Sequence, residues 1–253
     1  LGKTFEDPEL IMVRRSWAKN DFERLNFPIG YPNGEGGITP SQNLVDAYEM
    51  TDGSSFDWNN NRHKSEPYFN RDPRLAMTIY TNEAAFKDTH LECWAGGKNG
   101  KGVANATTTG YYLHKFIDED LDLAQGRTSI HTWIFFRISE MYLVKAEALG
   151  KMNGAATLVE YMKKRYTTAP SEAAIKALSD KEYQTLILDE RRREFYAEGM
   201  RWQDIKRTNR LELLETLDGR TYLMYYPIPQ DEIDMAGTVA YPQNPGYAGY
   251  TGN

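Results

Sequence analysis

The sequence contains one cysteine, Cys93, among 253 residues. A single thiol cannot form an intrachain disulfide, and it cannot supply a multi-cysteine metal site. The four histidines, His63, His90, His114 and His131, make no recognisable nucleophile motif with it. We therefore predict that Cys93 is an ordinary small side chain and that the protein uses no cofactor and no metal.

Basic stripes and long apolar runs are also lacking. The formal net charge is −6 and the pI is 5.4, which argues against a nucleic-acid partner because no basic stripe stands out to neutralise phosphates. Mean hydropathy is −0.66, and no apolar run approaches the ~18 residues of a membrane span. The chain opens almost at once on a strand-like segment, residues 9–17, without a signal peptide. We therefore expect a processed or truncated chain.

Composition divides the chain in two. Turn-forming stretches rich in Gly, Asn, Asp, Pro and aromatic residues occupy 27–43, 52–73 and 94–112. Loops this long in a compact domain tend to be functional. We predict a loop-rich, ligand-side region at residues 1–130 and a helical region at 131–253, which together form one domain.

Within the loop-rich region, the sequence predicts one short helix and two short strands. Thr39 as N-cap, Pro40 at the first helical position and Gln42 at the third form a capping box ahead of this helix. Residues 75–80 (LAMTIY) and 111–116 (YYLHKF) have the composition of strands.

The helical region begins with a predicted pair of helices. An apolar stripe indicates a helix at 136–149 that ends at Gly150. A second helix at roughly 155–166 follows after a few residues, which favours an antiparallel hairpin. This pair resembles one tetratricopeptide unit, and a single unit cannot bury its own faces.

A long helix is predicted next. Ser179 and Glu182 form a capping box at its start, and Gly199 interrupts or ends it. At 100° per residue, Glu190 and Glu194 fall in the middle of an apolar face. The other residues of that face are Tyr183, Leu186, Ile187 and Ala197.

Two functions are open for this pair of carboxylates. Their Cβ atoms should lie roughly 5–6 Å apart, close to the ~5–5.5 Å between the carboxyl groups of retaining glycosidases, so a glycoside hydrolase using Glu190 and Glu194 is one alternative. However, a glycosidase acid is left poorly compensated so that its pKa rises. A buried carboxylate must otherwise be paired, and arginines are nearby. We therefore favour structural ion pairs that involve Glu190, Glu194, Arg191 and Arg201.

Several segments of the chain carry a family resemblance. In chain order they are TPSQNLVDAYEMTDG (39–53), NRDPRLAMTIY (70–80), TGYYLHKF (109–116), FRISEMYLVKAEAL (136–149), DERRREFYAEGMRWQDIKR (189–207), YPIPQDEI (226–233) and QNPGY (243–247). Together they resemble the SusD/RagB family of outer-membrane lipoproteins of Bacteroidetes. One departure lies at residues 150–170, where the family usually has a segment containing Asn and Arg.

The resemblance implies a mainly α fold of tetratricopeptide-like helix pairs, an α-α superhelix, with long loops and a few short strands. It also implies that the protein binds a glycan or oligosaccharide without chemistry and delivers it to a SusC-like TonB-dependent transporter. Family members are about twice as long, so this chain resembles their C-terminal half. The lipid anchor that holds them on the outer surface of the outer membrane would then lie in the absent N-terminal half. A helical protein-interaction scaffold with no small ligand is a further alternative.

Exposed aromatic platforms beside polar groups are typical of glycan sites, because sugars present flat C–H faces ringed by hydroxyls. Trp58 is the first candidate, and Trp17 with Tyr31, and Trp94, are two more. The alternative for each is an aromatic that anchors a loop to the core, and we expect Trp133 and Trp202 to be core residues. The polar neighbours predicted around Trp58 are Asp57, Asn59, Asn60 and Arg62, with Tyr68 ten residues further along.

Overall fold

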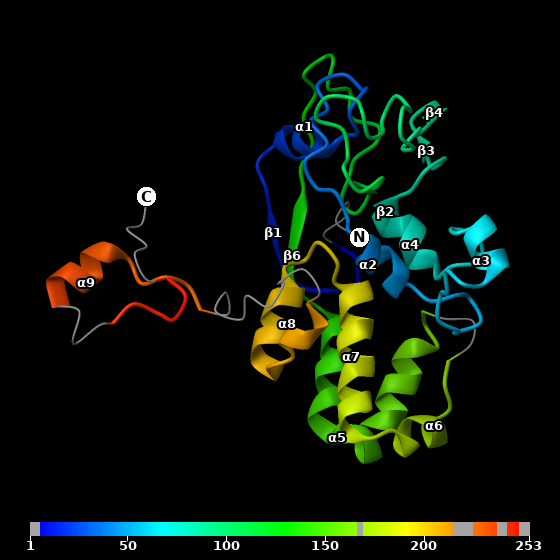
Figure 1. Ribbon diagram of the computed structural model, residues 1–253, viewed down its shortest axis with the longest axis vertical. Helices are drawn as coiled ribbons and strands as arrows, with labels where there is room; N and C mark the ends of the chain where they lie inside the picture. Colours follow the sequence, from blue (N-terminus) through cyan, green and yellow to red (C-terminus); the bar gives the residue numbers. More distant parts are fainter. Residues whose placement is uncertain (1–5, 166–168, 215–224, 237–241, 248–253) are drawn as a thin grey trace. The chain divides into compact units, whose positions relative to one another are not determined.

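The computed structural model describes residues 6–165, 169–214, 225–236 and 242–247 (Figure 1). The chain forms two compact units, Leu1–Glu198 and Gly199–Asn253. The boundary predicted near residue 130 falls inside the first unit, just before a strand that leads into its longest helix. Within the described residues, no helix is both long enough and apolar enough to cross a membrane.

The longest helix, α5 (Ile138–Met162), is two helices joined by a sharp break at Gly150, whose φ of 67° and ψ of 170° are not helical. The chain folds back at this break. A Cβ atom on Gly154 would lie 2.3 Å from the carbonyl oxygen of Ala146, and Tyr142 donates to Glu160 across the pair at 2.9 Å. This is the predicted antiparallel hairpin. Residue 166, the last of the predicted second helix, lies outside the described residues.

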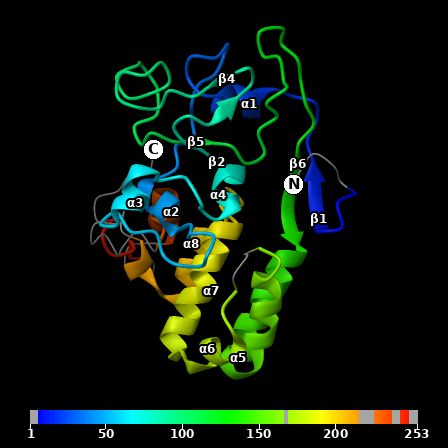
Figure 2. The same cartoon turned by 90° about the vertical axis from the view of Figure 1, so that its right-hand side faces the viewer.

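Helix α7 (Asp180–Glu194) packs along α5, and the short helix α6 (Glu172–Ala177) also packs on α5 (Figures 1 and 2). The predicted capping box at Ser179 and Glu182 is present in both directions. The predicted apolar face is wrong at its end: Ala197 is exposed and has a φ of 62°, because α7 stops at Glu194. The tyrosine hydroxyl of Tyr183 donates to Ala146 and ties α7 to the α5 hairpin.

The described residues of the first unit before α5 form four short helices and three two-stranded antiparallel sheets. The helices are α1 (Asp21–Asn26), α2 (Gln42–Ala47), α3 (Asn61–Ser65) and α4 (Pro73–Thr78). The sheets pair β1 (Leu10–Arg15) with β6 (Thr132–Arg137), β2 (Ile79–Tyr80) with β5 (Tyr112–Leu113), and β3 (Ala85–Phe86) with β4 (Thr89–His90). Figure 2 shows that β6 runs directly into α5.

Two local predictions in this region are wrong. Ser41, not Thr39, is the N-cap of α2, since its hydroxyl accepts from the Leu44 amide. Residues 75–78 are helical rather than extended, because Asp72 caps the amide of Arg74 and Pro73 occupies the first turn of α4. Proline fits there because the first-turn amide has no helical partner.

Two clusters of buried side chains form the core beneath the loops. One joins Phe27, Tyr80, Phe86, Leu91 and Tyr112 with further aliphatic residues. The other lies under α2 and α4 and contains Leu44, Val45, Tyr48, Leu75, Ile79 and Tyr111. The loops are therefore fixed by their own buried aromatic residues.

The second unit begins at Gly199, which has the left-handed conformation that favours glycine (φ 78°). Its described elements are α8 (Met200–Thr208), the 3-10 helix η1 (Leu211–Leu213) and α9 (Gln230–Ala236).

Candidate functional site

Trp58 presents a partly exposed ring in a fixed orientation. Its side chain is 42% exposed. The indole Nε1 donates to both carboxylate oxygens of Asp46, at 3.2 and 3.1 Å, and Phe56 meets the ring edge to face with the centroids 4.8 Å apart. Because the N–H is occupied by Asp46, the ring offers its face rather than a donor to a ligand.

Phe56 connects Trp58 to the body of the unit. The imidazole of His63 stacks on one side of Phe56 at 5.5 Å, and the guanidinium carbon of Arg71 lies 4.1 Å from its ring centroid. Arg71 is buried and donates to the backbone carbonyl groups of Val45 and Tyr48. The Trp58 ring therefore packs on Phe56, whose own position is fixed by the buried side chain of Arg71.

The polar residues predicted beside Trp58 mainly shape the loop. The carboxylate of Asp57 accepts from the backbone and side-chain nitrogens of Asn59, at 2.8 and 3.1 Å. Asn60 is the N-cap of α3 and accepts from the amides of Arg62 and His63. These contacts leave Asp57, Asn59 and Asn60 exposed while fixing their positions.

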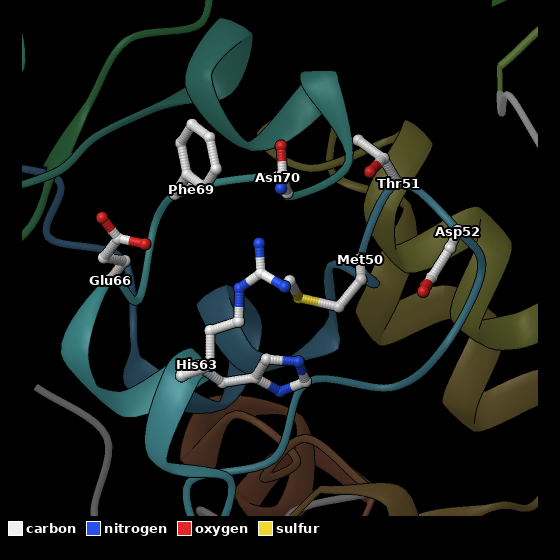
Figure 3. A pocket seen from close by; sticks show the side chains of 8 residues that line it. Met50, Thr51, Asp52, His63, Glu66, Phe69 and Asn70 are labelled. Carbon is white, nitrogen blue, oxygen red and sulfur yellow. The ribbon is translucent and has the colours of Figure 1, made fainter.

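A pocket of about 130 Å³ adjoins the Trp58–Phe56 pair. His63 connects the two, because it stacks on Phe56 and also lines the pocket. Figure 3 shows Glu66 and Asp52 on opposite sides of it. Hydrogen bonds from the Ser54 hydroxyl and amide hold the pKa of Asp52 below its ordinary value, so this carboxylate stays charged. The complete lining is Met50, Thr51, Asp52, Arg62, His63, Glu66, Phe69 and Asn70.

Tyr68 faces the core rather than this pocket. Its hydroxyl donates to that of Tyr111 at 3.3 Å, and Tyr111 donates to Gln42. Burial, followed by this hydrogen bond, raises the pKa of Tyr68 above its ordinary range. Tyr68 therefore supports the loop from below.

The other predicted aromatics lie elsewhere. Trp17 is 86% exposed and lines a separate groove with Trp133, which is half-buried rather than fully in the core. Tyr31 packs edge to face on Phe86 at 4.5 Å, and its hydroxyl pairs with that of Thr89. Trp94 is 46% exposed on the long loop before β5.

Several residues of the surface around Trp58 and the adjoining pocket are absent from the predicted set. They are Asp46, Phe56, His63, Glu66 and Phe69, which all lie within or close to the predicted loop. An aspartate on one helix gave no sequence signal that it would meet a tryptophan 12 residues later.

The carboxylates of Glu190 and Glu194 lie in a buried ion-pair network. Arg74 Nη1 lies 2.7 Å from Glu190 Oε1 and 2.8 Å from Glu194 Oε2. The second oxygen of Glu190 accepts from Arg193 at 2.8 Å, and that of Glu194 accepts from Arg137 at 2.6 Å. All of these side chains are at most one tenth exposed.

The other two residues of the predicted ion-pair set, Arg191 and Arg201, contact other groups. Arg191 Nη2 is 3.7 Å from Glu140 Oε1. Arg201 belongs to the second unit, where its guanidinium donates to the Leu213 carbonyl at 3.4 Å.

The electrostatics of Glu194 are the opposite of those of a glycosidase acid. Burial alone would raise its pKa, but the guanidinium groups of Arg137, Arg74 and Arg165 outweigh burial and hold the pKa well below its ordinary value. A general acid at neutral pH needs a raised pKa. Glu194 therefore cannot hold a proton at neutral pH to donate to a leaving group.

Comparison with known proteins finds SusD-like proteins by sequence and by structure. A SusD-like protein of Formosa agariphila is 33% identical over 97 residues, which are 35% of this chain and 19% of that protein. A SusD-like protein of Bacteroides fragilis matches with a TM-score of 0.75 at 22% identity, over 96% of this chain and 55% of that chain. A SusD-like carbohydrate binding protein of the same species gives 0.61 at 23% identity, over 76% and 40%.

These structures confirm the predicted fold, mainly α with tetratricopeptide-like helix pairs and a few short strands. The chain spans about half the length of the first of them, 55%, and a smaller share of the others. The model of the SusD family matches residues 8–220, most of the sequence. The chain therefore belongs to the SusD family.

Proposed function

We propose that this chain binds an oligosaccharide, without chemistry, at the surface formed by Trp58 and the adjoining pocket. The observation that carries the proposal is the exposed face of Trp58, whose edge is fixed by Asp46. A rigid aromatic plane can cover the C–H face of a sugar at little cost in conformational entropy. Family membership supports the same ligand class, since a structural neighbour is described as carbohydrate binding.

The pocket supplies the polar half of such a site. Sugar hydroxyls need both donors and acceptors, and the lining offers the guanidinium of Arg62 beside the carboxylates of Asp52 and Glu66. His63 lines the pocket and stacks on Phe56, which packs against Trp58. A sugar ring on Trp58 would then place its next residue toward these groups.

The state of the Glu190 and Glu194 carboxylates supports a non-catalytic role. Glu190 is fully buried, and Glu194 is charged and bound by three arginines. This arrangement supports structural ion pairing over the glycoside hydrolase alternative.

We propose further that the bound glycan is delivered to a SusC-like TonB-dependent transporter. The proposal includes a lipid-anchored position at the outer surface of the outer membrane. Both parts rest on family membership. Co-purification with an outer-membrane transporter would test the delivery, and protease treatment of intact cells would test the surface position.

The binding proposal is tested by calorimetric titration of neutral glucose, xylose and mannose oligomers into the wild type and Trp58→Ala. We expect Trp58→Ala to weaken binding by roughly 1–3 kcal/mol, as judged from the burial of a large side chain, with an almost unchanged melting temperature. Phe135→Ala is the matched control, because Phe135 is a similarly exposed aromatic residue outside the candidate glycan sites. Turnover of any oligomer would favour the hydrolase, and the absence of both binding and turnover would favour the interaction scaffold.

Asp46→Asn separates contact from positioning. The substitution keeps the size of the side chain but removes the charge that accepts from Trp58 Nε1. We expect a smaller loss of affinity than for Trp58→Ala, about 0.5–1.5 kcal/mol for one hydrogen bond. Normal affinity in Trp58→Ala, together with a much lower melting temperature, would make Trp58 a core anchor instead.

A further inference from the structure

A second groove lies where β1 and β6 meet α1, in the same unit as Trp58 but formed by other elements. Its volume is about 660 Å³. None of its lining residues is shared with the pocket beside Trp58. The residues that matter for the argument are Arg14, Trp17, Lys19, Phe22, His131 and Trp133.

The floor of this groove is a rigid aromatic cluster. His131 stacks on Trp133 with the ring centroids 5.2 Å apart and an interplanar angle of 27°. Phe22 meets both rings edge to face, at 5.0 Å from each. The buried carboxylate of Glu23 accepts from His131 Nε2 at 3.0 Å and from the amide of Asp118, which fixes the imidazole.

Cations stand directly beside this floor. The register of the β1–β6 pair places Arg14 opposite Trp133, and opposite residues of an antiparallel pair project from the same face with Cβ atoms about 4.5–5.5 Å apart. Arg14, Arg15 and Lys19 are exposed. Among the described residues, no salt bridge of Arg14 occurs within 4.0 Å, whereas the lining acid Asp21 is shared between Lys19 and Arg24.

Charge distinguishes the groove from the Trp58 surface. The groove has three cationic residues and one acidic residue in its lining, while the Trp58 pocket has Arg62 against Asp52 and Glu66. A guanidinium matches the planar, bidentate geometry of a carboxylate or sulfate. The aromatic floor matches the C–H face of a sugar ring.

We infer that this groove is a second glycan site, selective for a sugar residue that carries a carboxylate or a sulfate group. The ring covers Trp133 or Trp17, and its anionic group pairs with Arg14. The inference rests on the proposed function, because it assumes that the chain binds glycans, and it adds a chemical class of ligand and a separate location.

The test is a set of titrations with three trisaccharides: trigalacturonate, its fully methyl-esterified form, and a sulfated galactose trimer. The ester keeps the sugar rings and removes the charge. We expect Arg14→Gln to weaken binding of at least one anionic trimer about tenfold, which corresponds to about 1.4 kcal/mol, and to leave the ester unaffected. If the sugar ring lies on Trp17, Trp17→Ala should weaken binding of the anionic trimers and of the ester alike. Trp133→Leu tests in the same way whether the ring lies on Trp133.

Arg127→Gln is the charge-matched control, since Arg127 is exposed and lies outside the groove lining. Its binding of the anionic trimers should equal that of the wild type. The relative response to trigalacturonate and the sulfated trimer identifies which anionic group is preferred. Melting temperatures of all variants show whether a loss of binding reflects unfolding.

Anionic trimers that bind Arg14→Gln as tightly as the wild type, or that do not bind the wild type, would overturn the inference. The proposed function fails separately, when Trp58→Ala binds neutral oligomers normally. If Trp58→Ala loses binding of the anionic trimers and Arg14→Gln keeps it, the anionic ligand binds at the Trp58 surface and the second site is rejected.

Discussion

Arg137 Nη1 lies 2.6 Å from Oε1 of Glu194, so the residue that precedes α5 is tied to the last residue of α7. The same carboxylate accepts from Arg74, in α4, and from Arg165. A single side chain thus joins the loop-rich part of the first unit to its helical part. The charge of Glu194 has a structural role, and removal of this carboxylate should lower the stability of the protein.

We predict that Glu194→Ala lowers the free energy of unfolding by about 3–5 kcal/mol, because removal of one partner leaves buried charges uncompensated. Urea unfolding of the wild type and the variant measures the difference. Glu172→Ala is the control. Its carboxylate is 48% exposed in an i,i+4 pair with Lys176, and such surface pairs contribute about 0.3–0.5 kcal/mol. Equal losses in the two variants would contradict the structural role.

The same group predicts the response to acid. The pKa of Glu194 in the folded protein lies well below its ordinary value, since three arginines outweigh the effect of burial. The folded state therefore binds this proton less readily than the unfolded state does. The resulting stability is fully present above the ordinary glutamate pKa of about 4.3 and is lost as the pH falls below it toward the folded-state pKa. Unfolding free energies measured from neutral to acidic pH should fall less steeply in Glu194→Gln.

Glu49 provides a control, because its pKa is shifted in the opposite direction from that of Glu194. Burial raises its pKa, and Arg193, 3.6 Å away, offsets this only in part. Its contribution to stability is therefore present at low pH and is lost as the pH rises through the raised folded-state pKa. Glu49→Gln should make the rise of stability from acidic to neutral pH steeper. A flatter profile in this variant would show that Arg193 dominates.

A third prediction concerns the fold-back of α5. A Cβ atom at Gly154 would lie 2.3 Å from the Ala146 carbonyl oxygen and 2.7 Å from the Tyr183 hydroxyl. Glycine to alanine in a helix normally stabilises by up to about 1 kcal/mol, but here overpacking should destabilise by about 1–3 kcal/mol. Asn153→Ala, at the exposed neighbouring position, should be neutral or slightly stabilising. Thermal or urea unfolding gives the direction of the change in stability for each variant. A stabilised Gly154→Ala protein would show that the two halves of α5 are not in contact.

Local sequence signals account for part of the fold. The capping box of Ser179 and Glu182 needs residues three apart, and the break at Gly150 needs one glycine, so both could be predicted. The prediction failed where neighbouring signals compete: Thr39 and Ser41 are both capable caps, and Asp72 with Pro73 starts a helix in a strand-like sequence. Local patterns do not decide between such alternatives when tertiary contacts contribute as much.

The arrangement of the candidate site was less predictable than the fold. Trp58 could be selected from its polar loop, but its fixing by Asp46 and Phe56 depends on how the loop closes. Arg74 and Glu190 are 116 residues apart in sequence, and no periodicity relates them. Ion pairing of Glu190 followed from the cost of burying a charge, whereas the identity of its partner did not.

The last prediction concerns an exposed apolar face on the first half of α5. Ile138, Met141 and Val144, spaced by three residues, are 39%, 41% and 45% exposed, while Leu143 and Ala146 on the other side are fully buried. Exposed apolar surface of this kind marks an interface. We expect the chain alone to self-associate, and a protein extended by the N-terminal half expected from the family resemblance to melt higher.

Val144→Lys should shift the chain toward monomer in sedimentation velocity over a range of concentrations, without lowering its melting temperature. Ala173→Lys is the matched control, because it adds the same charge to an exposed position on another helix, α6, and removes no large apolar side chain. If charge repulsion alone prevents association, both variants become monomeric to the same degree. If the apolar face is responsible, Val144→Lys alone has the effect, since burying one valine side chain is worth about 1.5 kcal/mol or more and each contact between two copies would lose it. A wild-type chain that stays monomeric and melts like the extended protein would refute the prediction.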